Sequence, residues 1–92
     1  VRVKNKKTGE TREIACDGIF VAVGNIPNTA LVADAVKLTP NGYIDAGETT
    51  ETNLPGVFAA GDVRQKVLRQ VVTAVADGAV ASHMAEEYLS GI

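Results

Sequence analysis

Residues 57–71 read VFAAGDVRQKVLRQV, and this stretch decides the fold. Its first four residues are apolar, as in a short buried strand, and Gly61 and Asp62 stop that strand. A long helix is predicted soon afterwards, from about residue 68 to residue 89, because apolar residues recur along one helical face. In open α/β sheets, ligands lie beyond the carboxyl ends of the strands, so this junction is the candidate binding site.

The junction combines a carboxylate with the amino end of a helix. Gly61 has no side chain, so a ligand can approach closely, and Asp62 can accept hydrogen bonds from a polyol. The first N–H groups of the helix, near Arg69 and Gln70, lack partners within the helix and carry partial positive charge. Such a helix start would stabilise negative charge on a ligand, as on the N1–C2=O edge of a reduced flavin. Asp62 could equally cap a turn, and the residues alone leave both possibilities open.

The amino-terminal part of the chain is expected to form strands. Residues 1–5 and 11–16 alternate apolar and polar side chains around a turn at Gly9, which predicts a β-hairpin. Residues 19–23 read IFVAV, an apolar run without alternation that suits a strand covered on both faces. Cys16 is expected to be a small buried residue on its strand.

The middle of the chain is expected to mix turns with short elements. Residues 24–28 interrupt the strand pattern with a glycine and a proline. A short helix is predicted over about residues 30–36, capped by Asn28 or Thr29. Short strands are predicted at residues 43–44 and 57–60, with a polar loop between them.

Composition narrows the class of protein. The chain has 92 residues, of which 46% are hydrophobic and 22% charged, as in one small globular domain. The net charge of −2, without a long run of one sign, argues against nucleic-acid binding. No segment approaches the roughly 20 apolar residues of a membrane span. Nothing at the start argues for secretion, and a chain that opens directly in a strand pattern is expected to be a piece of a longer protein.

Four motifs together resemble the pyridine-nucleotide disulfide oxidoreductases. Residues 52–62, TNLPGVFAAGD, are similar to that family's second FAD motif. Residues 68–74, LRQVVTA, followed by Asp77-Gly78-Ala79, resemble the bacterial low-molecular-weight thioredoxin reductases in particular. Residues 18–24, followed by Pro27-Asn28-Thr29, match the family's domain-junction motif, and residues 41–44 also fit. The resemblance therefore runs over essentially the whole chain, with its motifs in the family's order.

The resemblance implies an α/β fold, as the C-terminal fragment of a flavoprotein with two dinucleotide-binding domains. A β-hairpin and a buried strand would be followed by short strands and a long C-terminal helix. Residues 1–24 would end the NADPH-binding domain, and residues 25–92 would form the C-terminal part of the FAD-binding domain. Residues 24–28 would cross between the domains, where a glycine and a proline could form a hinge.

The resemblance also implies roles for the site residues. Gly61 and Asp62 would belong to the FAD site, with the Asp62 carboxylate on the ribityl chain. Arg69, Gln70 and Val71 would present backbone or side-chain groups to the flavin. The parent enzyme would pass hydride from NADPH to FAD, and electrons onward to a disulfide and to thioredoxin. It would be a cytoplasmic homodimer that binds no nucleic acid or membrane.

The fragment alone is expected to be inactive. The family's Gly-x-Gly-x-x-Gly loops and its redox Cys-x-x-Cys do not occur in these 92 residues, and Cys16 alone cannot cycle as a disulfide. We therefore assign no catalytic residue and no metal ligand. Two alternatives stay open: the flavoprotein subunit of an alkyl hydroperoxide reductase, and a non-catalytic excised fragment that folds or oligomerises without cofactor.

Five further polar residues are assigned structural positions. Asp77, an acid inside a helix of small residues, is expected to make a structural hydrogen bond. His83 is expected to lie on the surface or partly buried in the helix, and Glu86 and Glu87 on a solvated face. Tyr43 is expected to contribute to the core.

Overall fold

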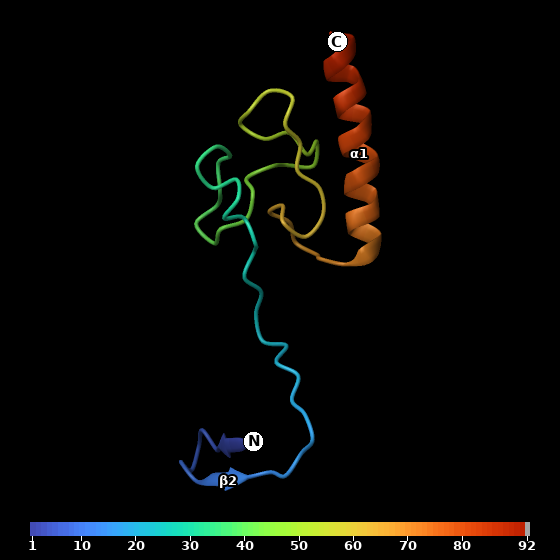
Figure 1. Ribbon diagram of the computed structural model, residues 1–92. Helices are drawn as coiled ribbons and strands as arrows, with labels where there is room; N and C mark the ends of the chain where they lie inside the picture. Colours follow the sequence, from blue (N-terminus) through green and yellow to red (C-terminus); the bar gives the residue numbers. More distant parts are fainter. Residues whose placement is uncertain (92) are drawn as a thin grey trace.

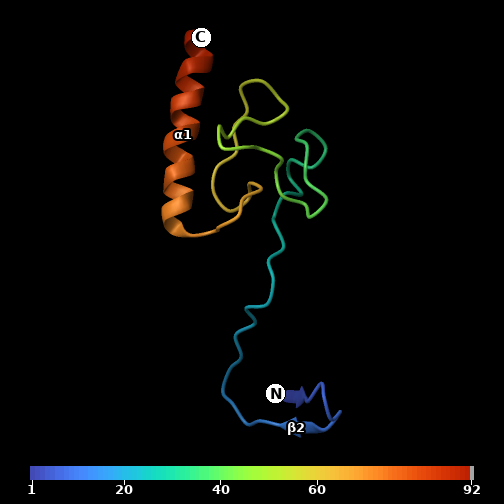
Figure 2. The ribbon, with the colours of Figure 1, turned by 180° about the vertical axis from the view of Figure 1, so that it is seen from behind.

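A hairpin, an extended linker, a loop-rich body and one long helix follow one another along the chain (Figure 1). The computed structural model describes residues 1–91. The hairpin consists of β1 (Arg2–Lys4) and β2 (Thr11–Glu13), and the helix is α1 (Val71–Ser90). The molecule measures 63 × 27 × 23 Å, because the linker holds the hairpin far from α1, as the view from behind also shows (Figure 2).

The predicted hairpin is confirmed. β1 and β2 pair antiparallel, with Val3 opposite Arg12, and Gly9 takes the positive φ of +74° that the turn requires. The prediction that Cys16 is buried is wrong, because its side chain is exposed. No other described element packs against the hairpin, so its residues are open to solvent on both faces.

The apolar run at residues 19–23 does not form the covered strand that its sequence predicts. Phe20 is 100% exposed and Val21 is 81% exposed, and the run lies in the extended linker. A strand in a parallel sheet needs hydrogen-bonded neighbours, and no segment among residues 1–91 pairs with this run. The linker therefore contains a sequence typical of a strand, but its backbone is not part of a sheet.

Turns replace the short helix predicted over residues 30–36. The N–H of Val32 donates to the Thr29 carbonyl (3.1 Å), and the N–H of Val36 donates to the Val32 carbonyl (2.9 Å). The Thr29 hydroxyl donates to the Gly42 carbonyl at 2.7 Å, which ties these turns to another part of the body. One helical turn is too short to be stable by itself.

The two short strands predicted at residues 43–44 and 57–60 shrink to isolated bridges. Ile44 bridges to Leu38 and to Arg64, and Phe58 bridges to Glu51. These bridges hold the body together around a small core of buried residues: Val36, Tyr43, Ile44, Ala46 and Ala59.

The helix α1 begins at Val71, three residues later than predicted. Gln70 is the N-cap, with an extended φ of −142°, and its N–H donates to the Thr73 hydroxyl at 3.0 Å. The helix ends at Gly91, as predicted, where a φ of +73° closes the left-handed C-cap. This helix is not long and apolar enough to cross a membrane, and residues 1–91 contain no other.

The far end of α1 rests on the body through an aromatic contact. Tyr88 meets Phe58 edge to face, with ring centres 6.4 Å apart. Gly56 makes this approach possible, because a Cβ there would lie 2.9 Å from the Tyr88 ring. The positive φ of Gly56, +80°, also favours glycine at this turn.

The chain buries little surface for its size. Its accessible surface is 7388 Å², whereas a compact protein of this mass exposes about 5,100 Å². Its radius of gyration is 19.3 Å, against about 12 Å for a compact domain of this length. The exposed apolar linker accounts for part of this excess, so we expect the linker to be the first segment that a protease reaches.

Limited chymotrypsin digestion of the chain should cut first after Phe20, because the enzyme needs an exposed, extended backbone around an aromatic residue. Mass spectrometry of the early products should give fragments that end at residue 20 and begin at residue 21. Tyr43 and Phe58 are internal controls, since both are at least partly buried. Early cleavage at these residues with Phe20 intact would contradict the described linker.

Candidate functional site

The residues predicted for the site gather at the amino end of α1. A hollow of about 580 Å³ is lined by Asp62, Arg69, Gln70 and Val71, together with Ala74 and Val75 from the first turns of the helix. Asp62 itself is exposed. The structure thus brings four of the five predicted residues around one open hollow, lined by one acid, two valines and the residues between them.

Gly61, the fifth predicted residue, lies beside this hollow and allows the strand end to approach the helix. Its φ of +85° turns the chain, and a Cβ at this position would lie 3.8 Å from the Ala74 Cβ. The small side chain of Ala74 on the helix permits this close approach. A larger residue at Gly61 would carry the strain of the left-handed conformation.

Arg69 and Gln70 precede the helix, and the prediction that they lie in its first turn is wrong. The Arg69 Nε donates to the Asp62 carbonyl at 3.0 Å, and its Nη2 donates to the Arg64 carbonyl at 3.2 Å. Its guanidinium also stacks on the Tyr43 ring, 3.7 Å from the ring centre. These contacts tie the segment just before the helix to the residues that follow the Gly61 turn.

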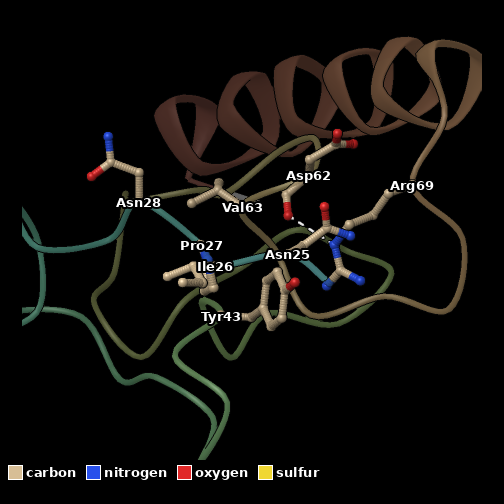
Figure 3. A pocket seen from close by; sticks show the side chains of 8 residues that line it. All are labelled: Asn25, Ile26, Pro27, Asn28, Tyr43, Asp62, Val63 and Arg69. Atoms are coloured by element: carbon tan, nitrogen blue, oxygen red, sulfur yellow. Dashed lines mark hydrogen bonds between the residues drawn. The ribbon is translucent and has the colours of Figure 1, made fainter. Parts of the chain in front are cut away.

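A second hollow, of about 400 Å³, shares Asp62 and Arg69 with the first (Figure 3). Its lining residues are Asn25, Ile26, Pro27, Asn28, Tyr43, Asp62, Val63 and Arg69. In Figure 3 the carboxylate of Asp62 points away from Tyr43, and the dashed line joins Arg69 to the Asp62 carbonyl. Asp62 and Arg69 therefore border both hollows, and the second hollow also includes part of the predicted domain crossing.

A buried charge network holds α1 against the strand end. The Asp77 Oδ2 accepts hydrogen bonds from the Gly61 N–H (2.9 Å), the Arg64 Nε (3.0 Å) and the Lys66 Nζ (2.7 Å). Its Oδ1 accepts from the Arg64 Nη2 at 2.9 Å. The side chains of Arg64, Lys66 and Asp77 are only 3%, 5% and 9% exposed. The expected structural hydrogen bond of Asp77 is confirmed, as part of a larger network.

These contacts set the protonation of the network. The hydrogen bonds from Arg64 lower the pKa of Asp77 far below its ordinary value, and those from Lys66 and Gly61 act in the same direction against the effect of burial. The same bonds raise the pKa of Arg64. Asp77 therefore stays charged throughout the neutral and mildly acidic range.

Sequence reasoning missed Arg64 and Lys66. Both follow the Gly-Asp pair closely, and an unpaired acid six residues into a helix of small side chains was the available signal for buried cations nearby. The exposed Glu48 adds a weaker contact to Arg64 at 3.5 Å.

The remaining polar residues lie where they were expected. His83 is exposed and pairs with Glu87 on the helix surface at 3.3 Å, and Glu86 is exposed. Tyr43 is buried beneath Arg69. Among residues 1–91, no group of His, Cys, Asp and Glu side chains could hold a metal ion.

Comparisons with known proteins give the chain a family. The family model described as pyridine nucleotide-disulphide oxidoreductase matches residues 1–78. The thioredoxin reductase of Treponema pallidum is 51% identical over 89 residues, which cover 97% of this chain and 29% of that protein. A bifunctional thioredoxin reductase/thioredoxin of Mycobacterium leprae is 42% identical, over 98% of this chain and 20% of its own length. This chain thus spans less than a third of these relatives.

A solved structure matches both the hairpin and the body. The crystal structure of Lactococcus lactis thioredoxin reductase, in its FR conformation, superposes with a TM-score of 0.88 at 45% identity. The match covers 97% of this chain and 29% of that chain.

Replacing Asp77 with Asn should destabilise the chain, because it leaves two buried cations without their counterion, at a cost of about 3–5 kcal/mol. The depressed pKa of Asp77 means that its contribution is complete above the ordinary Asp pKa, near 3.9, and is lost as the pH falls further. In urea unfolding followed by the circular dichroism of the helix, the urea midpoint of the wild type should therefore fall from pH 5 to pH 2. The midpoint of Asp77→Asn should change less over the same pH range. The exposed Glu86→Gln is the matched control on the same helix. Equal urea midpoints for Asp77→Asn and wild type at pH 7 would contradict the described network.

Proposed function

Since the chain belongs to the pyridine nucleotide-disulphide oxidoreductase family, we propose that it is the C-terminal segment of an NADPH-dependent thioredoxin reductase and supplies part of the FAD site. The observation that carries this proposal is the hollow at the start of α1, which Asp62, Arg69, Gln70 and Val71 line together. This lining is compatible with both parts of a flavin. The polyol chain could lie next to the carboxylate, and the ring could lie next to the helix N–H groups and the valine side chains. The residues present therefore fit FAD.

Each lining group has a role in this proposal. The exposed Asp62 carboxylate accepts hydrogen bonds from hydroxyl groups of the ribityl chain. The first N–H groups of α1, which begin at Val71, would stabilise the negative charge that a bound flavin gathers on reduction. Gln70 caps the helix, and Arg69 fixes the approach to it through the Asp62 carbonyl. Bound FAD would supply the hydride and electron transfer, for which these side chains provide only binding and orientation.

The rest of the reaction requires groups beyond this chain. Cys16 is its only cysteine, and one thiol cannot form a redox disulfide within the chain. We assign residues 1–24 to the end of the NADPH-binding domain and residues 25–92 to the FAD-binding domain. The extended linker and the exposed apolar run at residues 19–23 support this division, since the other strands of an NADPH-binding domain would cover that run.

The proposed partners and setting follow from the same assignment. The whole enzyme would reduce thioredoxin as a cytoplasmic homodimer. This assignment is tested by measuring NADPH oxidation by the purified full-length protein with oxidised thioredoxin as the only electron acceptor. Turnover that requires a thioredoxin-like domain on the same polypeptide, and fails with free thioredoxin, would favour the flavoprotein subunit of an alkyl hydroperoxide reductase instead. A full-length protein without flavin would favour the non-catalytic alternative.

In the full-length protein, Asp62→Ala should weaken FAD binding about 10- to 100-fold, because hydrogen bonds to a charged group contribute about 1.5–3 kcal/mol. The measurement is the ratio of flavin absorbance to protein absorbance after gel filtration, followed by titration of the apoprotein with FAD. Asp34→Ala is the control, since Asp34 is an exposed acid that lines neither hollow. A flavin content that matches the wild type in Asp62→Ala would reject the role of this carboxylate.

A further inference from the structure

We propose that Asp77 is a positioning residue of the flavin site, which fixes where Asp62 lies relative to the first turn of α1. Asp77 does not line the hollow that contains Asp62 and Val71. It acts on this hollow through the backbone of Gly61 and through Arg64 and Lys66. The inference rests on the proposed function, because it assigns Asp77 a role in the same FAD site.

The backbone around Asp62 is attached on both sides. Immediately before it, the Gly61 N–H donates to Asp77 on the helix at 2.9 Å. Immediately after its Cα, the Asp62 carbonyl accepts from Arg69, which lies two residues before α1, at 3.0 Å. The backbone of Asp62 is therefore held by Asp77 of the helix on its amino-terminal side. On its carboxy-terminal side it is held by Arg69, just before the helix.

The loop from residue 61 to residue 66 closes around one carboxylate. All four hydrogen-bond donors to Asp77 come from this loop: the Gly61 N–H, two nitrogens of Arg64 and the Lys66 ammonium group. Arg64 and Lys66 are buried and both pair with Asp77, whereas Asp62 in the same loop stays exposed. The Arg64 Nη1 also donates to the Ala46 and Gln65 carbonyls, and the backbone of the loop bonds to Ile44. The body and Asp77 thus hold the loop together, and Asp77 is its attachment to the helix.

A bidentate ion pair makes this attachment directional. Arg64 contacts both oxygens of Asp77 in the fork geometry that fixes orientation as well as distance. With Oδ1 held in this way, Oδ2 is aimed at the Gly61 N–H and the Lys66 Nζ. Loss of the charge on Asp77 would release the loop even if the helix stayed folded, and displacements of about 1 Å are enough to impair a site.

A positioning role predicts changes that a purely structural role does not. If Asp77 only stabilises the fold, its loss lowers the melting temperature and leaves the spectrum and potential of bound flavin unchanged. If Asp77 positions the site, the helix start and the Asp62 carboxylate shift relative to the flavin. The flavin then binds more weakly, and its midpoint potential becomes more negative, because the helix start stabilises the reduced anion less well.

The experiment compares Asp77→Asn, Arg64→Lys and the control Glu86→Gln in the full-length flavoprotein. Asp77→Asn keeps the shape of the side chain, and Arg64→Lys keeps the charge but removes the two-point contact. For each folded variant we would measure FAD affinity by titration of apoprotein, visible circular dichroism of the bound flavin, and the midpoint potential. We expect FAD affinity to fall about tenfold or more in Asp77→Asn and by an intermediate factor in Arg64→Lys, with altered circular dichroism and a more negative potential.

Wild-type affinity, flavin spectrum and potential in folded Asp77→Asn would overturn the proposal, even if its melting temperature were lower. If Asp77→Asn does not fold, Arg64→Lys decides by the same three measurements. The Asp62→Ala variant separates this inference from the proposed function. Flavin loss in Asp62→Ala with wild-type behaviour in Asp77→Asn rejects only the positioning role, whereas full flavin retention in Asp62→Ala rejects the flavin assignment itself.

Discussion

The rest of the structure depends on one buried carboxylate. Asp77 gathers four donors from a single loop, and through them it holds the only long helix of residues 1–91 against a body with a very small apolar core. A core of this size contributes little hydrophobic stabilisation, so the attachment of α1 relies on ionic and hydrogen-bonded contacts, with the contact of Tyr88 at its far end. Removing one partner of a buried ion pair is much more damaging than its net contribution suggests, because the other charge is left unpaired.

Local patterns predicted the elements that need no distant partner. The hairpin around Gly9, the long helix and its stop at Gly91 all depend on residues close in sequence, and all are found. The run at residues 19–23 was misjudged, because an apolar segment becomes a sheet strand only when neighbouring strands are present. Turns replace the short helix predicted at residues 30–36, where a segment of about two turns is too short to be stable by itself.

Part of the candidate site could be predicted from the sequence. The juxtaposition of Asp62 with the start of α1 follows from a strand that ends in Gly-Asp a few residues before a helix, and these residues do border one hollow. The family resemblance placed the same residues in an FAD site, which is a proposal about their chemistry. Asp77 indicated that buried cations lie nearby, but a pattern of charges along a loop does not tell that Arg64 and Lys66 are the side chains that fold inward. The helix starts at Val71, and the Arg69 side chain just before it donates to the carbonyls of Asp62 and Arg64, contacts that a helical pattern does not reveal.

The exposed linker has a consequence for handling the chain by itself. No charged residue occurs between Asp17 and Asp34, and the run at residues 19–23 is rich in β-branched and aromatic side chains with its backbone unpaired. Short, uncharged segments of this kind can stack into intermolecular cross-β assemblies. Gly24 and Pro27 confine that tendency to about five residues, which makes Phe20 and Val21 the natural positions for a solubilising charge in laboratory preparations of the isolated segment.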